Sequence, residues 1–582
     1  MLAAIQKTQL MFLDLNLNSD SMKRLLIILS TIVLGFTSCD LKEELYINID
    51  AETYITNAAS ARNVLWGVYR NMGTNNLYGR HLSIMLDMPT DVSRVDEASD
   101  INGRDVCWNA HTADNNVILE VWSGAYRVIY YANDFLEKVA AARPDMRAED
   151  QARVDIYMAE ARAIRAMMYF ELVRLFGGVT LMTTTEQSYQ HPSTFKRDSP
   201  EKIYEFIETE LTDCCKILPW AQDDKLRSDN SFMFSKAAAL GLNARVYATH
   251  AGYPLRDETK WEKCDSCCRE IINAGYNSLL PQYEKLWENC CNGVWDPSEA
   301  LIQICFYSPV WSSQSSQNNS GYIGKWNGVH IVSNSSNLIR VDARQRALTV
   351  FMADWKDYDK DLRWGLSAAD YSYDGLTQVP MDSKKSGEKI PFTSVIDGSS
   401  SDKNPYKKGL YIAKYDLTKY VAQDKQLRDG NYSNANWYVM RYADVLLLHA
   451  EAQNELNNGP TEEAYNSINM VRRRGFGQED LTAPCAESDL APGLDYEGFL
   501  KAIRDERAYE LCFEGNRKQD LIRWGIYYET IDRVVDRLNG FKEEFGSKYS
   551  WYWKTVKGKH ELQPIPQREK DLMTQYDQNP NW

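Results

Sequence analysis

Apolar residues recur at helical spacing through most of the chain between residues 50 and 276. The segments 58–72, 117–139 and 153–176 each repeat an apolar residue every three or four positions, which places those residues on one face of an α-helix. Ser199 and Pro200 are suited to begin a helix over 200–218, and further helices are expected over 235–250 and 261–273. Small and large residues alternate on these faces, so neighbouring helices can approach closely. The pattern predicts a mainly α, tetratricopeptide-like scaffold of helical pairs, although no strict repeat is visible.

The pattern changes between residues 277 and 436. Helical periodicity weakens there, Gly, Ser, Asn and aromatic residues interleave, and short apolar runs such as 300–304 indicate isolated strands. Helices are expected again over 442–456, 461–474 and 496–517, with a shorter one from about residue 526. We therefore expect a single unit over 39–582, with a helical scaffold at 50–276 and 437–540, an irregular insertion at 277–436 and a docked tail at 541–582.

Residues 1–38 have the pattern of a removable leader. Lys23 and Arg24 precede an apolar stretch over 25–36, which is shorter than the roughly 20 residues needed to span a bilayer. We interpret Met22 as the true first residue of the protein and residues 1–21 as an extension assigned in error. The string over 36–39 resembles the lipobox of bacterial lipoproteins, which predicts a lipid anchor on Cys39; an ordinary signal peptide is the alternative. Residues 40–44 resemble the surface-export signal of Bacteroidetes lipoproteins, or form a charged tether.

Composition and charge exclude several classes of protein. The chain of 582 residues is 44% hydrophobic and 25% charged, which is typical of a globular protein. Its net charge of −15, with no dense basic stretch, argues against nucleic-acid binding.

The sequence contains no motif for catalysis or for a cofactor. Its seven histidines are scattered, and neither a nucleophile elbow nor a phosphate-binding loop is present. The cysteines at 264, 267 and 268, with those at 290 and 291, superficially resemble a zinc site, but packed thiols or a disulfide explain them better. The aspartates at 354, 357, 359 and 361 lack the Gly and Glu of a calcium loop and are interpreted as a solvated acidic helix. We therefore predict a protein that is not an enzyme, with no metal and no cofactor.

Several strings in the second half of the chain carry a family resemblance. Arg504-Asp505-Glu506-Arg507 leads to Glu514-Gly515, and further strings lie at 441–452, 468–474, 517–524, 564–566 and 578–582. Together with the strings at 122–133 and 165–179, they resemble the RagB/SusD family of outer-membrane nutrient-binding lipoproteins. The charged residues of these strings allow helical ion pairs at a spacing of three, namely Arg507 with Glu510, Glu514 with Arg517, and Asp520 with Arg523.

The resemblance implies a function on the cell surface. A protein of this family would capture an oligosaccharide and deliver it to a TonB-dependent SusC-like transporter, while a lipid holds it on the outer membrane. Capture of peptides, as in RagB-like members, is the alternative. A surface glycoside hydrolase and a structural lid without a ligand of its own also remain open.

The resemblance also implies an aromatic platform built from loops of the amino-terminal half and the insertion. Flat aromatic rings cover the apolar faces of sugars, while amide and guanidinium groups bind their hydroxyls. Two polar segments, 87–116 and 307–330, fit this description, although each aromatic residue could instead anchor its own loop. The candidate contacts are Arg104, Trp108, Trp311, Tyr322, Trp326 and Asn327.

Overall fold

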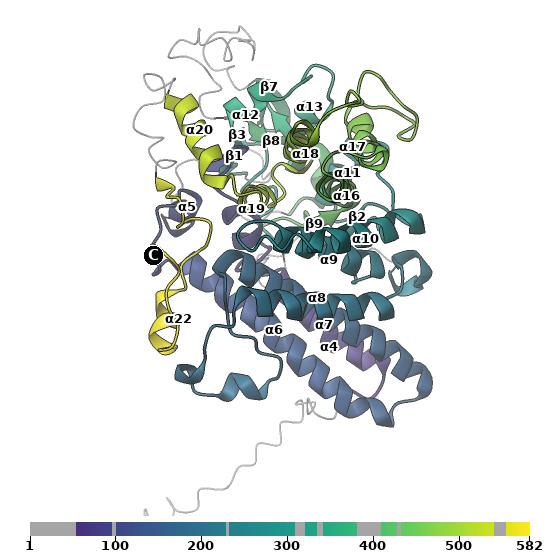
Figure 1. The fold of residues 1–582 in the computed structure, drawn as a ribbon, viewed down its shortest axis with the longest axis vertical. Coiled ribbons are helices and arrows are strands. Elements are labelled where there is room, and N and C mark those ends of the chain that lie inside the picture. Colours follow the sequence, from purple (N-terminus) through teal and green to yellow (C-terminus); the bar gives the residue numbers. More distant parts are fainter. Residues whose placement is uncertain are drawn as a thin grey trace, which may run out of the picture. The chain divides into compact units, whose positions relative to one another are not determined.

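Successive helices lie against one another through most of the described chain, as the computed structural model shows (Figure 1). The described residues are 54–95, 101–227, 232–308, 320–333, 341–380, 409–427, 432–539 and 554–582. Those from Ile55 to Trp582 belong to one compact unit. Within the described ranges, no helix has both the length and the apolar character needed to cross a membrane.

The amino-terminal helices include a continuous stack from α6 to α10. They are α4 (Ala58–Met72), α5 (Ile101–Cys107), α6 (Asn116–Ala142), α7 (Ala148–Phe176), α8 (Pro200–Ile217), α9 (Lys236–Ala251), α10 (Lys260–Ala274) and α11 (Tyr283–Cys291). Contacts run from α6 to α7, α8, α9 and α10 in order, while α4 packs on both α6 and α7. The predicted mainly α, helical-pair scaffold is confirmed.

Local sequence explains where these helices begin and how closely they pack. The Ser199 side chain caps the start of α8 immediately before Pro200, as its position predicts. In α7 the alanines at 159, 161, 163 and 166 are buried, so the helices on either side can approach closely. Gly177 ends α7 with a φ of 71°, which an L side chain adopts only with strain.

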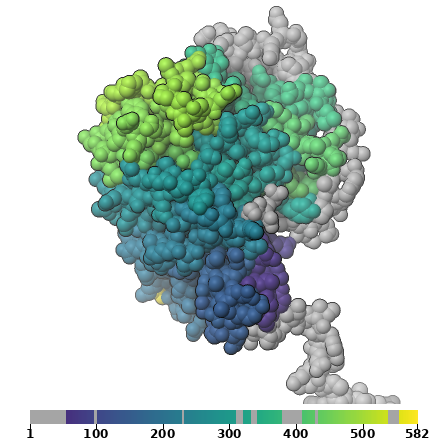
Figure 2. Space-filling view, turned by 90° about the vertical axis from the view of Figure 1, so that its right-hand side faces the viewer, coloured from purple at the N-terminus to yellow at the C-terminus, as the bar shows by residue number. Residues whose placement is uncertain are grey.

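The carboxyl-terminal helices continue from α10. They are α12 (Thr349–Asp354), α13 (Arg363–Ser367), α15 (Leu417–Tyr420), α16 (Tyr442–Asn457), α17 (Glu462–Gly475), α18 (Tyr496–Leu511), α19 (Arg517–Arg523), α20 (Tyr527–Asn539) and α22 (Gln567–Leu572). The long helix α16 contacts α10, α17 and α18. In Figure 2 the amino-terminal helices (purple and blue) and the segment around α17 and α18 (yellow-green) occupy opposite ends of this unit.

Short strands join distant parts of the described chain. The strands are β1 (Ser93–Val95), β2 (Ala300–Ile304), β3 (Ile331–Ser333), β4 (Gln345–Ala347), β5 (Ala368–Ala369), β6 (Tyr371–Asp374), β7 (Thr377–Pro380), β8 (Tyr411–Ile412) and β9 (Trp437–Arg441). They pair as β1–β4, β2–β9, β3–β6–β7 and β5–β8, and only β3–β6 is parallel. The strand expected over 300–304 is present as β2, and its partner β9 leads directly into α16.

Two expectations from the sequence were wrong. The helix expected over 496–517 ends at Leu511, because Phe513 and Gly515 have φ values of 66° and 75° and form a turn before α19. The run of aspartates at 354–361 is not a solvated helix, because α12 ends at Asp354 and a turn follows. Asp361 is buried against Arg363 at a distance of 2.7 Å.

The last described residues lie against the amino-terminal helices. The Asn579 side chain donates to the Phe176 carbonyl (2.9 Å), and the Tyr576 hydroxyl accepts from the backbone N–H of Thr180 (2.9 Å). Trp582 contacts the rings of both His111 and His560, with centroid distances of 4.8 and 5.2 Å. The carboxyl terminus therefore contributes to the packing of the helical stack.

Candidate functional site

Three segments that are far apart in sequence meet beside the end of α4. The backbone N–H of Tyr322 donates to the Gly79 carbonyl at 2.9 Å, and Gly321 forms a β-bridge with Ser433. The Asn75 amide donates to the Tyr432 hydroxyl at 3.3 Å. Residues 73–80, 320–330 and 432–436 are thus held together as one surface.

An arginine lies among aromatic rings on this surface. The Arg80 guanidinium carbon is 4.8 Å from the centroid of the Tyr322 ring and 5.8 Å from that of Trp326. The ring of Tyr432 meets Tyr322 edge to face at 4.9 Å. Arg80, Tyr322 and Tyr432 are all half-buried, so each retains accessible surface. Asn75, Arg80, Tyr322, Trp326 and Tyr432 are called the Arg80 cluster below.

A hollow of about 260 Å³ lies beside the Arg80 cluster. Phe306 and Ser433 line it and also contact Gly321, which places the hollow next to Tyr322. Tyr307, which is 74% exposed, stands on its wall. The remaining polar lining includes Ser308, Asn434 and Lys425. Hydroxyl, amide and ammonium groups therefore accompany aromatic rings on this face.

A second arginine–tryptophan pair lies on α5. The Arg104 guanidinium carbon is 4.9 Å from the Trp108 ring centroid, and Arg104 also forms an ion pair with Asp105 at 2.9 Å. The Trp108 indole N–H donates to the Val95 carbonyl at 3.4 Å. Trp108 is half-buried, so part of its ring remains accessible.

The β1–β4 ribbon connects the two tryptophans. Val95 in β1 lies opposite Gln345 in β4, and the backbone N–H of Gln345 donates to the Trp326 carbonyl at 3.1 Å. The Trp108 indole N–H is bonded to Val95, which belongs to the other strand of the same ribbon. The structure thus brings the two segments that the sequence singled out onto one small sheet.

The predicted residues differ in how much surface they offer. Trp326 is only 5% exposed, and Asn327 is fully buried, where its side-chain oxygen accepts from the Gly324 N–H at 2.7 Å and holds the turn. Tyr322 and Trp108 keep part of their rings accessible. Trp311, like Cys39, lies outside the described residues.

Sequence reasoning missed Asn75, Arg80 and Tyr432. Asn75 and Arg80 belong to a short polar loop after a helix, and Tyr432 precedes a strand, so none lies in the segments rich in aromatic residues. Only the pairing of Gly321 with Ser433 and the contact of Tyr322 with Gly79 bring them together. The one local signal was the pair of adjacent asparagines at 75 and 76 followed by the arginine at 80.

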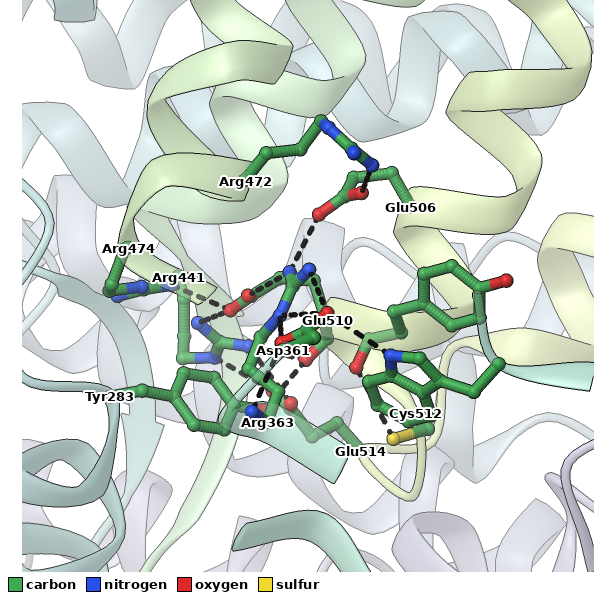
Figure 3. A network of polar contacts seen from close by, with 12 residues as sticks. Tyr283, Asp361, Arg363, Arg441, Arg472, Arg474, Glu506, Glu510, Cys512 and Glu514 are labelled. Atoms are coloured by element: carbon green, nitrogen blue, oxygen red, sulfur yellow. Dashed lines mark hydrogen bonds and ion pairs between the residues drawn. The ribbon is translucent and has the colours of Figure 1, made fainter. Parts of the chain in front are cut away.

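Charged residues of the strings that carry the family resemblance form part of a buried ionic network instead of a reactive site (Figure 3). It joins five cations and five carboxylates from eight elements and loops: Arg363, Lys414, Arg441, Arg472, Arg474, Glu299, Asp361, Glu506, Glu510 and Glu514. At its centre Glu510 lies within 3.0 Å of Arg363, Arg441 and Arg474. This group is called the Glu510 network below.

The electrostatics of the Glu510 network fit a structural role. Burial raises the pKa of Glu510, but Arg474, Arg441 and Arg363 outweigh that effect and hold it far below the ordinary carboxyl range. A carboxylate that is ionised at every physiological pH is a poor proton donor or acceptor. The network therefore fixes the packing of α13, α17, α18 and β9.

The described residues offer no cluster for a metal. No group of three or more His, Cys, Asp or Glu side chains among them is arranged to hold an ion. The cysteines in these ranges are free thiols, and most are buried. The packed-thiol interpretation of the cysteine pairs is thus the one that the described geometry favours.

Comparisons with known proteins agree with this geometry. The sequence model described as "SusD family" matches residues 340–582, and the one described as "Starch-binding associating with outer membrane" matches residues 41–248. A SusD homologue from Bacteroides thetaiotaomicron is 44% identical, with a TM-score of 0.85 over 91% of this chain and 98% of that one. A laminarin-binding SusD-like protein has the same fold at 21% identity and a TM-score of 0.62, covering 90% and 100% of the two chains. A SusD-like protein of Formosa agariphila is 27% identical over 86% of this chain and 90% of its own length.

Proposed function

Because the chain belongs to the SusD family, we propose that it is a cell-surface lipoprotein that captures an oligosaccharide at the Arg80 cluster. It then delivers the sugar to a TonB-dependent SusC-like transporter in the outer membrane. Capture involves no covalent change, so the protein is a binding protein and not an enzyme. The lipid on Cys39 would hold it at the membrane surface.

The observation that carries this proposal is the composition of the Arg80 cluster and the hollow beside it. The rings of Tyr322, Tyr432 and Tyr307 provide flat apolar surface for the C–H face of a sugar. The guanidinium of Arg80, the amide of Asn75 and the ammonium of Lys425 offer groups that bind hydroxyls. Aromatic surface with a few polar groups around it is typical of small-ligand sites.

The setting of the cluster supports binding without large rearrangement. Arg80 is held between two rings, and Tyr322 is fixed by backbone bonds at Gly79 and Ser433. A side chain that is already ordered loses little conformational freedom when a ligand arrives. The cluster can therefore bind a sugar with modest contact area.

The relatives support a glycan as the ligand. One matching family is described as starch-binding and associated with the outer membrane, and one structural neighbour is a laminarin-binding protein. The net charge of −15 favours neutral sugars over acidic ones at long range. Starch and laminarin fragments are therefore the first ligands to test.

Titration calorimetry on protein that begins at Asp40 tests the proposal with maltoheptaose, laminarihexaose and a set of short peptides. We expect one of the glycans to bind and Tyr322→Ala to weaken it at least about tenfold, equivalent to about 1.4 kcal/mol. Tyr253→Ala is the matched control, because Tyr253 is also partly exposed and has Arg256 over its ring at 5.8 Å. Binding of peptides alone would replace the glycan by a peptide ligand. Release of shortened sugars would reveal a hydrolase instead.

A further inference from the structure

A second aromatic pocket, lined by other residues than the Arg80 cluster, lies on the helical scaffold. It has a volume of about 290 Å³ and is formed by one face of α6, the segment 182–188 after α7, and α22 with the residue that follows it. Figure 1 shows α22 beside α6. None of the residues that line it belongs to the Arg80 cluster or to the hollow beside that cluster. It is called the α6 pocket below.

Aromatic rings line the α6 pocket and continue onto its rim. Trp122, Tyr126 and Tyr130 follow one another along α6 at a spacing of four, which places them in a row on one face of the helix. Trp122 is buried, whereas Tyr126 and Tyr130 are half-buried. On the rim, the Tyr189 hydroxyl lies 3.4 Å from that of Tyr130, and 77% of the Tyr189 side chain is exposed.

The α6 pocket also contains polar groups that the protein leaves uncommitted. Within the ranges that the structure describes, the Ser123 hydroxyl and the Glu569 carboxylate make no side-chain hydrogen bond. The Glu569 side chain is half-buried; this burial raises the pKa of its carboxyl group, and the charge of the neighbouring Arg568 opposes that effect. A half-buried carboxyl group that makes no hydrogen bond gains from a ligand that donates one. Sugar hydroxyls are such donors.

Packing alone does not account for these features. A core aromatic residue buries its ring, but Tyr189 leaves most of its ring in solvent and is held near the pocket by one hydroxyl contact. The neighbouring Asn133, in contrast, is fully engaged, since it donates to the Met182 carbonyl and accepts from Arg165. Asn133 and Tyr126, whose hydroxyl donates to the Thr180 carbonyl, thus make the structural contacts of this region, whereas Glu569 makes no side-chain hydrogen bond among the described residues.

We propose that the α6 pocket is a second carbohydrate-binding site, which takes one sugar ring of a glycan between Tyr130, Tyr189 and Glu569. This proposal rests on the proposed function, because the same class of ligand is assigned to both sites. The volume lies near the lower end of the roughly 300–1,000 Å³ that small-ligand pockets occupy, which fits a single ring and not a long chain. Two separated sites on one molecule would strengthen the retention of a polysaccharide that reaches both.

Titration calorimetry with short oligosaccharides tests the proposal, because its stoichiometry counts the ligand sites on each chain. With maltotriose or laminaritriose we expect two molecules per chain for the wild type. We expect one molecule for Tyr322→Ala and one for Tyr189→Ala. Tyr189 is a safe position for substitution, since its exposed ring contributes little to folding.

Two further variants separate ligand contact from a local structural effect. Glu569→Gln should weaken the second binding event at least fivefold, because the amide is a poorer acceptor than the carboxylate. Asp571→Asn is its matched control on the same helix, since Asp571 is exposed and bonds only to Gln567 among the described residues. It should leave both events unchanged.

The results distinguish failure of this proposal from failure of the proposed function. A single binding event that Tyr322→Ala abolishes and Tyr189→Ala leaves intact would overturn the second site and keep the first. A wild type that binds none of the oligosaccharides would overturn both. Equal weakening by Glu569→Gln and Asp571→Asn would also overturn the assignment of Glu569 as a ligand contact.

Discussion

Glu510→Gln should destabilise the protein more than any surface substitution on the same helix. The carboxylate lies 3.0, 2.9 and 2.6 Å from Arg363, Arg441 and Arg474, and all four side chains are essentially fully buried. The Glu510 network contains equal numbers of cations and carboxylates, so the substitution leaves one buried positive charge uncompensated. Breaking a buried ion pair by removing one partner costs about 3–5 kcal/mol.

Urea unfolding at pH 7, followed by circular dichroism, measures this effect. The control is Asp505→Asn, also on α18, because Asp505 pairs with Lys501 at the surface, where such a pair contributes about 0–1 kcal/mol. We expect a clearly lower midpoint for Glu510→Gln and an unchanged one for Asp505→Asn. If both variants unfold at the wild-type midpoint, the reasoning that assigns the network to the stability of the fold is refuted.

Three further predictions follow from buried and exposed groups elsewhere. Burial raises the pKa of Asp87 to about 7, so the stability that its protonated form contributes is lost as the pH rises from about 4 through 7; Asp87→Asn should be more stable than the wild type at pH 8 in thermal unfolding, with an advantage that shrinks toward pH 4. Hydrogen bonds with Ser488 lower the pKa of Cys485, whereas burial raises that of Cys267; maleimide labelling followed by mass spectrometry should modify Cys485 first, and faster labelling of Cys267 would contradict this. Trp582→Ala removes a ring that contacts two histidines and an indole N–H that donates to two carbonyls, so it should cost about 1–3 kcal/mol in denaturant unfolding, and an unchanged midpoint would show that the terminus is not part of the packed structure.

The helical scaffold could be predicted because its information is local. The expected helix over 153–176 corresponds to α7, Ala148–Phe176, and the one over 200–218 corresponds to α8, Pro200–Ile217. Their ends are determined by residues within the helix or beside it, such as the cap at Ser199 and the glycine at 177. Periodicity and capping are properties of consecutive residues, so a single sequence displays them.

Partners of buried charges could not be predicted in the same way. Asp520 does pair with Arg523 at 2.9 Å, as the spacing of three allows. Arg507, however, pairs with Asp444 and Asp520, and Glu514 pairs with Lys414 and Arg441. The turn after Leu511 rotates Glu514 away from α18, and the other partners come from elements many residues away. Helical spacing predicts which charges can meet within one helix, not which helices meet.

The candidate site depends on the same long-range contacts. Tyr322 and Trp108 could be selected because large aromatic residues stood in polar segments. Trp326 and Asn327 met the same criterion, but the structure places them in the interior of their loop. Aromatic residues among polar ones do not reveal which side chains of an irregular loop face the solvent, because such a loop has no fixed period. Arg80 could be identified as a candidate site residue only from its contacts with the aromatic rings in the structure.

Two short connections link the Glu510 network to the Arg80 cluster. Arg441, at the end of β9, follows the segment of Tyr432 by only a few residues, so the network fixes the strand from which that segment extends. The turn at Gly515 packs closely against Ser83, which follows Arg80 by three residues. A Cβ added at Gly515 would lie 3.0 Å from the Ser83 carbonyl oxygen. A rigid charged core thus positions the loops that present the aromatic side chains.

These connections predict that two kinds of variant differ in their unfolding midpoint and in their affinity for the glycan. Glu510→Gln should lower both the unfolding midpoint and the affinity for the glycan, because the positions of the loops depend on the network. Tyr322→Ala should lower the affinity while the midpoint stays within the small range typical of surface substitutions, about 0.5 kcal/mol. If Glu510→Gln instead lowered stability and left the affinity unchanged, the loops would hold their arrangement through their own backbone bonds at Gly79 and Ser433. The site would then be preorganised locally, and the buried network would serve the scaffold alone.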